Sequence, residues 1–151
     1  MSLKSLLNTD ANDRVTTLLR ITLAVVMFPH GAQKMLGWFG GGGFSGSMDF
    51  FTHQMGIPAI FAVLAILAEF AGSLGLLTGL ATRVAAFGVA VNMLVAVVMV
   101  HGANGFFMNW AGTQKGEGFE YHLLAIGIAV ALMIRGGGAY SADAAVVAKV
   151  G

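Results

Sequence analysis

Long apolar runs with embedded polar side chains are the feature that most constrains this chain. The run RITLAVVMFPHGAQKMLGWFGGGG, residues 20–43, is apolar enough to cross a bilayer, yet it contains Arg20, His30 and Lys34. A charged side chain in hydrocarbon costs roughly 2.5–3.5 kcal/mol on insertion scales, so it persists only where a partner or water receives it. The function of the protein should therefore involve these side chains and the groups that meet them.

The composition places the chain in a membrane. Of its 151 residues, 57% are hydrophobic and 10% are charged, and the mean hydropathy is +0.81. A soluble domain carries about 25% charged residues, so this chain has too few to cover a surface that faces water. The net charge of +1 and the lack of a basic run argue against a nucleic-acid partner. The chain has no cysteine, which excludes disulfides and thiolate metal ligands within it.

Four apolar runs predict an all-α fold, an integral membrane four-helix bundle. Spans of about 20 residues cross the ~30 Å of bilayer hydrocarbon, and the predicted spans cover residues 15–36, 57–81, 84–102 and 119–135. A short amphipathic helix over 45–56, with Ser47 as its N-cap, is predicted to lie in the interface between the first two spans. The transmembrane domain is then residues 15–135. It is flanked by an N-terminal segment, 1–14, and a weakly structured C-terminal tail, 136–151.

Loop charges predict the orientation of the bundle. One side holds five basic residues and the other holds two: Lys4, Arg14, Arg83, Arg135 and Lys149 against Lys34 and Lys115. Because cytoplasmic loops carry the excess of Lys and Arg, we expect both termini in the cytoplasm of a multi-pass inner (plasma) membrane protein. The bilayer is then the first partner of the chain.

A first group of polar residues is expected to form a buried inner layer. Arg20, Glu69 and Asn92 lie within three different spans. We expect Arg20 to pair with Glu69, or alternatively to extend toward the cytoplasmic headgroups. Glu69 is then either half of a structural ion pair or a carboxylate that accepts protons or binds a ligand, as intramembrane acids often do.

A second group is expected to form an outer cluster. His30 and Lys34 share a face of the first span, His101 ends the third, and Glu120 and His122 open the fourth. In an antiparallel bundle these helix ends lie at one membrane level, so the side chains should converge on a wet pocket. On an ideal helix Asn92 and His101 would lie about 180° apart, so a straight third span could not turn both toward one seam.

The outer cluster could in principle hold a metal, a haem or a quinone. The sequence lacks the His-x₃-His or Glu-x-x-His spacing that would hold a metal on one helix, so no metal is predicted. Haem ligated by His30 and His101 is weaker still. A quinone fits better, because its carbonyls need donors such as His or Lys, a nearby acid can supply protons, and Trp38 and Phe39 could flank its ring.

In these features the chain resembles the DoxX family of small bacterial four-span membrane proteins. The resemblance covers about residues 15–145, and its features are Arg20, His30-Gly31 with Lys34 and Gly37, the segment EFAGSLGLLTGLATR from Glu69, His101, the Gly118-to-Glu120 entry to the fourth span, and the Gly136–Asp143 tail. The family is named beside DoxD, a membrane subunit linked to thiosulfate:quinone oxidoreduction, and other members are associated with oxidative-stress complexes. The resemblance thus implies a quinone-linked or redox-linked role.

Three functions follow as hypotheses. The first is a membrane subunit of a quinone-linked oxidoreductase, with Glu69 and His30 as the proton-transferring residues. Its binding residues are Arg20, His30, Lys34, Trp38, His101, Glu120 and His122. Such a subunit needs a partner redox protein or a homo-oligomer. The second is a non-enzymatic membrane anchor or assembly subunit in which the Arg20–Glu69 pair is structural, and the third is a small transporter.

Overall fold

The protein is almost entirely helical, and the computed structural model describes residues 3–150. No strand occurs within that range. The elements are α1 (Leu3–Leu7), α2 (Arg14–Leu36), the 3₁₀ turn η1 (Trp38–Gly40), α3 (Gly43–Asp49), the π-helical turn η2 (Phe50–Gln54), α4 (Ala59–Thr78), α5 (Thr82–Met99), the 3₁₀ turn η3 (His101–Asn104), α6 (Glu120–Arg135) and α7 (Ala142–Val150). The predicted all-α class is confirmed.

Four of these helices pack side by side. Helix α2 contacts α4 and α6, and α5 contacts the same two helices, so the four close a bundle. Helices α2, α4 and α5 are long and apolar enough to span a membrane, whereas α6 has only 16 residues. Three predicted spans are therefore supported, and the fourth stays a prediction.

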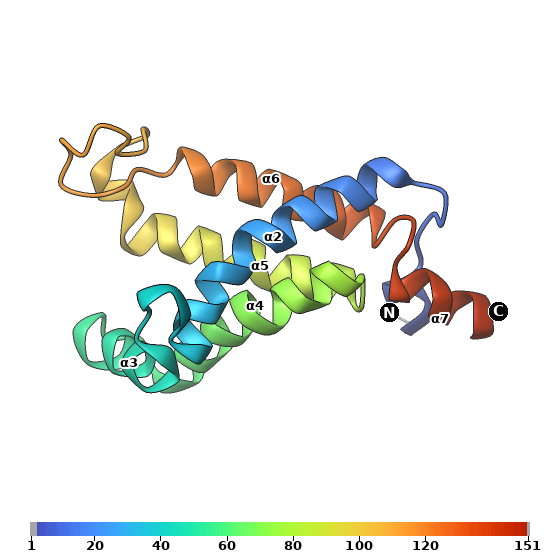
Figure 1. Ribbon diagram of the computed structural model, residues 1–151, viewed down its shortest axis with the longest axis horizontal. Coiled ribbons are helices and arrows are strands. Elements are labelled where there is room, and N and C mark those ends of the chain that lie inside the picture. Colours follow the sequence, from blue (N-terminus) through green and yellow to red (C-terminus); the bar gives the residue numbers. More distant parts are fainter. Residues whose placement is uncertain (1–2, 151) are drawn as a thin grey trace.

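The bundle has two different ends, visible in Figure 1. At one end, called the terminal end below, α1 packs against α7 beside the start of α2. At the other, called the loop end, lie α3 and the loop of residues 103–118. Figure 1 shows α5 and α6 diverging from α3 and α4 toward the loop end. The apolar core lies between α2, α5 and α6, around Met27, Val89 and Ala129.

The helix that follows the first span differs from its prediction in one respect. It begins at Gly43 and runs through η2 to Gln54, so Ser47 lies inside it and not at its N-cap. The predicted helix is thus present, but glycines begin it. The backbone at Gly43 has a φ of 65°, a conformation that favours glycine.

The predicted weakly structured tail is wrong. Residues 136–139 are buried, and α7 follows them. Asp143 is 1% exposed and its carboxylate accepts hydrogen bonds from the backbone N–H groups of Ala81 (2.7 Å) and Thr82 (2.9 Å), which begin α5. A carboxylate at a helix N-terminus satisfies otherwise unpaired donors and favours the helix dipole. The tail is therefore part of the folded terminal end.

Helix α4 ends where the tail docks. Gly79 has a φ of 71°, and a Cβ built there would lie 2.5 Å from Cβ of Ser141. Only glycine combines that left-handed backbone with so close an approach. The sequence places Gly79 in a GxxxG pair with Gly75, which is typical of helix packing. In the structure, Gly79 instead ends the helix and admits the tail.

Contacts of Asp13 and Arg83 hold the terminal end together. The Asp13 carboxylate caps α2 by accepting from the N–H and the hydroxyl of Thr16, at 2.9 and 2.7 Å, and it pairs with Arg135 at 2.6 Å. These hydrogen bonds, with that from the Thr16 backbone as the largest cause, lower the pKa of Asp13 well below its usual value of 3.8. Arg83 donates to the carbonyls of Met133 and Ile134 at the end of α6.

Candidate functional site

The register between α2 and α4 sets the site. A Cβ on Gly31 would lie 2.6 Å from Cα of Phe70 and 2.7 Å from the carbonyl carbon of Glu69. The missing side chain at residue 31 therefore lets the two backbones touch beside Glu69. Because residues three apart on a helix share a face, this contact brings Lys34 level with Glu69.

Lys34, Glu69 and Asn92 form a hydrogen-bonded polar cluster, called the Glu69 cluster below. The Lys34 ammonium donates to Oε2 of Glu69 at 2.5 Å, and the Asn92 amide donates to Oε1 at 2.9 Å. Glu69 is 4% exposed. Each carboxylate oxygen thus has a donor, and the ammonium neutralises the buried charge, which is the condition for keeping an ion in an apolar setting.

The expected Arg20–Glu69 pair is wrong. Arg20 is 1% exposed, and its Nη1 donates to the carbonyls of Leu76 (2.6 Å) and Leu77 (2.9 Å) at the end of α4. Its Nε donates to Gly137 (2.8 Å) and its Nη2 to Tyr140 (3.1 Å), both in the tail. The Gly31 contact places Glu69 about 16 Å farther along α2 at ~1.5 Å per residue. The sequence does not reveal that register.

The Glu69 cluster lies on the wall of a large pocket of about 1590 Å³. The pocket is mostly apolar, and its ionisable and amide side chains come from α2, α4, α5, α6, η3 and the 103–118 loop: His30, Lys34, Glu69, Asn92, His101, Glu117, Tyr121 and His122. A concave apolar pocket with a few convergent polar groups is typical of a small-molecule site.

Two neighbouring histidines from η3 and α6 line the same pocket. The rings of His101 and His122 lie 4.1 Å apart between centroids. Nδ1 of His101 lies 2.8 Å from the carbonyl oxygen of Glu117. A carbonyl only accepts, so Nδ1 of His101 carries a proton. His122 is 6% exposed, and its Nδ1 is buried with no hydrogen-bond partner. An unpaired buried polar atom costs free energy, so His122 sits at a destabilised position beside the pocket.

The Tyr121 ring lies near the rings of both His30 and His122. The ring of Tyr121 lies 6.5 Å from that of His30 on α2, and its hydroxyl contacts the sulfur of Met27 at 3.4 Å. His30 itself opens onto the pocket. Two predicted site residues that are far apart in sequence, His30 and His122, are therefore connected through one aromatic side chain.

Asn92 and His101 can both face the pocket because α5 ends between them. The helix stops at Met99, and Val100 has non-helical dihedrals (φ −130°, ψ −61°) before η3 begins. His101 is therefore turned relative to the helix, and both side chains line the pocket. The predicted span 84–102 overran the helix, which is why its periodicity set them on opposite faces.

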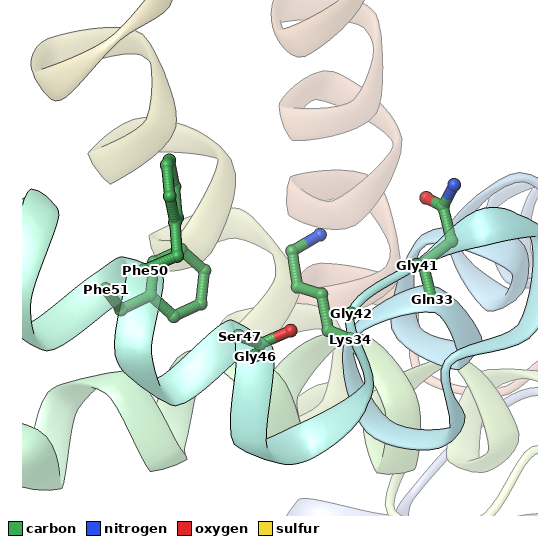
Figure 2. A pocket seen from close by; sticks show the side chains of 8 residues that line it. All are labelled: Gln33, Lys34, Gly41, Gly42, Gly46, Ser47, Phe50 and Phe51. Atoms are coloured by element: carbon green, nitrogen blue, oxygen red, sulfur yellow. The ribbon is translucent and has the colours of Figure 1, made fainter.

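Lys34 also faces a second, shallower pocket of about 320 Å³. Figure 2 shows Lys34 rising from the end of α2 beside Ser47 of α3, with Phe50 and Phe51 across the hollow. The Lys34 side chain is 27% exposed, against 6% for that of Glu69. Lys34 therefore connects the buried carboxylate with the loop-end surface.

Three predicted ligand residues lie outside the large pocket. Trp38 is 53% exposed and packs edge-on against Phe28, with ring centroids 6.4 Å apart. Oε1 of Glu120 accepts from the backbone N–H of Met108 (2.8 Å) and from Nε1 of Trp110 (3.3 Å). Glu120 thus holds the 103–118 loop in place. Arg20, as described, lies at the terminal end.

Sequence reasoning missed two pocket residues. Glu117 belongs to the loop between the third and fourth predicted spans, and the fold brings that loop back to His101. Tyr121 precedes His122 on α6, and adjacent residues are about 100° apart on a helix, so periodicity alone would put only one of them at the pocket. Its position next to a candidate histidine was the only available signal. Among residues 3–150, no group of three His, Asp or Glu side chains is arranged to hold a metal ion.

Comparison with known proteins adds one finding. A sequence model of the DoxX family matches residues 15–102, which include α2 to α5 and the Glu69 cluster. The chain belongs to the DoxX family. Neither the curated proteins nor the solved structures give a match. Together with its apolar helices, membership of this family identifies the chain as a membrane protein.

Proposed function

We propose that this DoxX protein is a membrane subunit of a quinone-linked oxidoreductase, with the quinone head group bound in the large pocket. The observation that carries the proposal is the convergence of the Glu69 cluster and the neighbouring rings of His101 and His122 on one mostly apolar space. Family association adds the quinone and redox context. We further propose a four-span arrangement in the inner membrane with both termini cytoplasmic, which follows from the loop charges.

The pocket residues fit a quinone in their chemistry. A quinone held there would supply two-electron, two-proton redox chemistry. Its carbonyl oxygens need hydrogen-bond donors, and the pocket lining offers them from Lys34 and His30.

The residues of the chain would manage protons and orientation. Glu69 holds a carboxylate against the pocket, where it can take up and pass on a proton, and Lys34 is placed to exchange protons with the loop-end surface. The chain has no cysteine, so thiol redox chemistry within it is excluded. A partner redox protein supplies the electrons in this proposal.

An anchor or assembly role is the rival function. It is favoured by the terminal end, where Arg20 and Asp143 bond only to backbone groups in the contacts described above and act as structural residues. That role would require stable packing and would not require polar side chains in the pocket. The two functions therefore differ in what changes to the pocket should do.

Binding of a decyl-substituted benzoquinone to the purified protein tests the proposal. We expect His30→Ala, which removes a donor, and Glu69→Gln, which removes the carboxylate that holds the Lys34 ammonium in place, each to weaken binding by up to about tenfold. Asp49→Asn is the matched control, since its side chain is 63% exposed and pairs only with His53 in the contacts of the described chain. Affinity unchanged in both pocket variants would refute the proposal and favour the anchor.

A further inference from the structure

The large pocket continues as an apolar groove along the seam between α4 and α5, called the α4–α5 groove below. Beyond the Glu69 cluster, the groove is lined by Ala71, Leu74 and Thr78 on α4 and by Val84 and Phe87 on α5. These residues lie toward the terminal end. One continuous space therefore joins the polar pocket to the apolar flank of the bundle.

The continuous space is larger than a head group requires. Ligand pockets for drug-sized molecules hold about 300–1,000 Å³, and this space has about 1590 Å³. Its charged and imidazole side chains all lie in the loop-end half. In the groove itself, the hydroxyl of Thr78 donates back to the carbonyl of Leu74 at 2.9 Å. The groove thus offers hydrocarbon contact and no polar partner.

The shape of the groove follows from small residues at its floor. A Cβ on Gly88 would lie 3.3 Å from Cβ of Ala68, and one on Gly72 would lie 3.7 Å from Val89. The two helices therefore pack closely at the floor. The flanking side chains Val84 and Phe87 are each 55% exposed, so the groove opens sideways to the bilayer.

We propose that the ligand of the large pocket carries a single hydrocarbon chain, which lies in the α4–α5 groove while its polar head contacts the Glu69 cluster. This inference rests on the proposed function and names its substrate class: a lipid-soluble, long-tailed quinone. A neighbouring helix is about 10–12 Å wide and could cover the groove, but it could not continue into the polar pocket. A flexible chain attached to the head group can occupy both.

The position of the tail tests the proposal better than affinity does. Lipid is as apolar as the groove, so moving a tail between them gains little free energy. The probe is a benzoquinone whose alkyl chain ends in a diazirine, photolysed with the full chain in lipid nanodiscs. We expect labelled residues to concentrate on the groove walls of α4 and α5, and excess decyl-substituted benzoquinone to compete that labelling away.

Two bulky variants report whether the groove itself is occupied. Ala71→Trp places a large ring in the groove, and Leu124→Trp adds similar bulk on the exposed face of α6, where Leu124 is 71% exposed and outside the pocket lining. We expect Ala71→Trp to lower groove labelling by about tenfold, as overpacking of an occupied site does. Leu124→Trp should leave it unchanged. Val91→Trp, on the α5 wall, should repeat the Ala71→Trp result.

The outcomes separate this inference from the proposed function. If Glu69→Gln abolishes benzoquinone binding, the head-group site is supported. If the diazirine labelling is at the same time spread evenly over the lipid-facing helices, the proposed position of the tail is wrong. The absence of both binding and competed labelling overturns both proposals. A change of oligomeric state in Ala71→Trp, with labelling unaltered, would show that a second copy of the chain covers the groove and would also overturn the inference.

Discussion

Arg20 and Lys34 are both basic residues of α2, yet they meet opposite surroundings at the two ends of the bundle. Arg20 is 1% exposed and donates to backbone carbonyls of α4 and the tail. Lys34 donates to the Glu69 carboxylate, and its side chain is 27% exposed between two pockets. Backbone carbonyls cannot change charge, whereas a carboxylate can take a proton.

The same contrast holds for the other polar residues of each end. At the terminal end, Asp143 and Arg83 bond to the backbone at helix termini. At the loop end, Glu69 and His122 face a pocket, and His122 keeps an unpaired nitrogen. Buried polar groups that are satisfied by fixed backbone stabilise a fold, and those that face a cavity are available to a ligand. Three experiments probe this division.

The largest effect is expected at Arg20. Arg20→Met leaves the carbonyls of Leu76, Gly137 and Tyr140 without their donor in a buried setting, at about 1–3 kcal/mol for each unsatisfied group. We expect loss of folded protein or a marked fall in thermal stability. The measurements are the yield from size-exclusion chromatography and the melting temperature in detergent. Arg14→Met removes the same charge from an exposed side chain and should be nearly neutral. Equal stability of the two variants would contradict a structural role for Arg20.

A smaller and more informative effect is expected for the Lys34–Glu69 pair. Lys34→Met leaves the buried Glu69 without its cation, and we expect a loss of about 1–3 kcal/mol in the free energy of unfolding. Lys34→Met combined with Glu69→Gln should cost less than the sum of the single changes, because the unpaired charge is gone. The double variant should nevertheless fail to bind benzoquinone. If it binds as the wild type does, the pair is structural, like Arg20.

The smallest effect concerns pH at the terminal end. The folded protein lowers the pKa of Asp13, so its stabilising contribution is complete above the usual value of 3.8 and is lost as the pH falls below it. Melting curves between about pH 3 and pH 6 should therefore show a downward slope toward acid that is weaker in Asp13→Asn. If the melting temperature of Asp13→Asn falls toward acid as steeply as that of the wild type, a residue other than Asp13 causes the acid sensitivity. Benzoquinone binding should be the same in both proteins at neutral pH.

The sequence predicted much of the helical architecture because its signals are local. Apolar length, the short loops and the Gly-rich breaks place α2, α4 and α5 to within a few residues. The sequence also named most of the polar residues that line the pocket, including His30, Lys34 and Glu69, since charge within an apolar run is conspicuous. It could not assign their partners. Whether Glu69 meets Arg20 or Lys34 depends on how two helices slide past each other.

Tertiary structure decided that register, and the cause is one contact. Gly31 against Phe70 brings the backbones of α2 and α4 together at the level of Glu69, which moves this carboxylate from the expected inner layer to the loop end. The docked tail has a similar origin, because Gly79 and Asp143 act only when residues far apart in sequence meet. The amino-acid sequence by itself determined a helical membrane protein with buried charge. The three-dimensional packing determined which charges are structural and which face a ligand, because hydrogen-bond partners follow from distances between helices that no local pattern encodes.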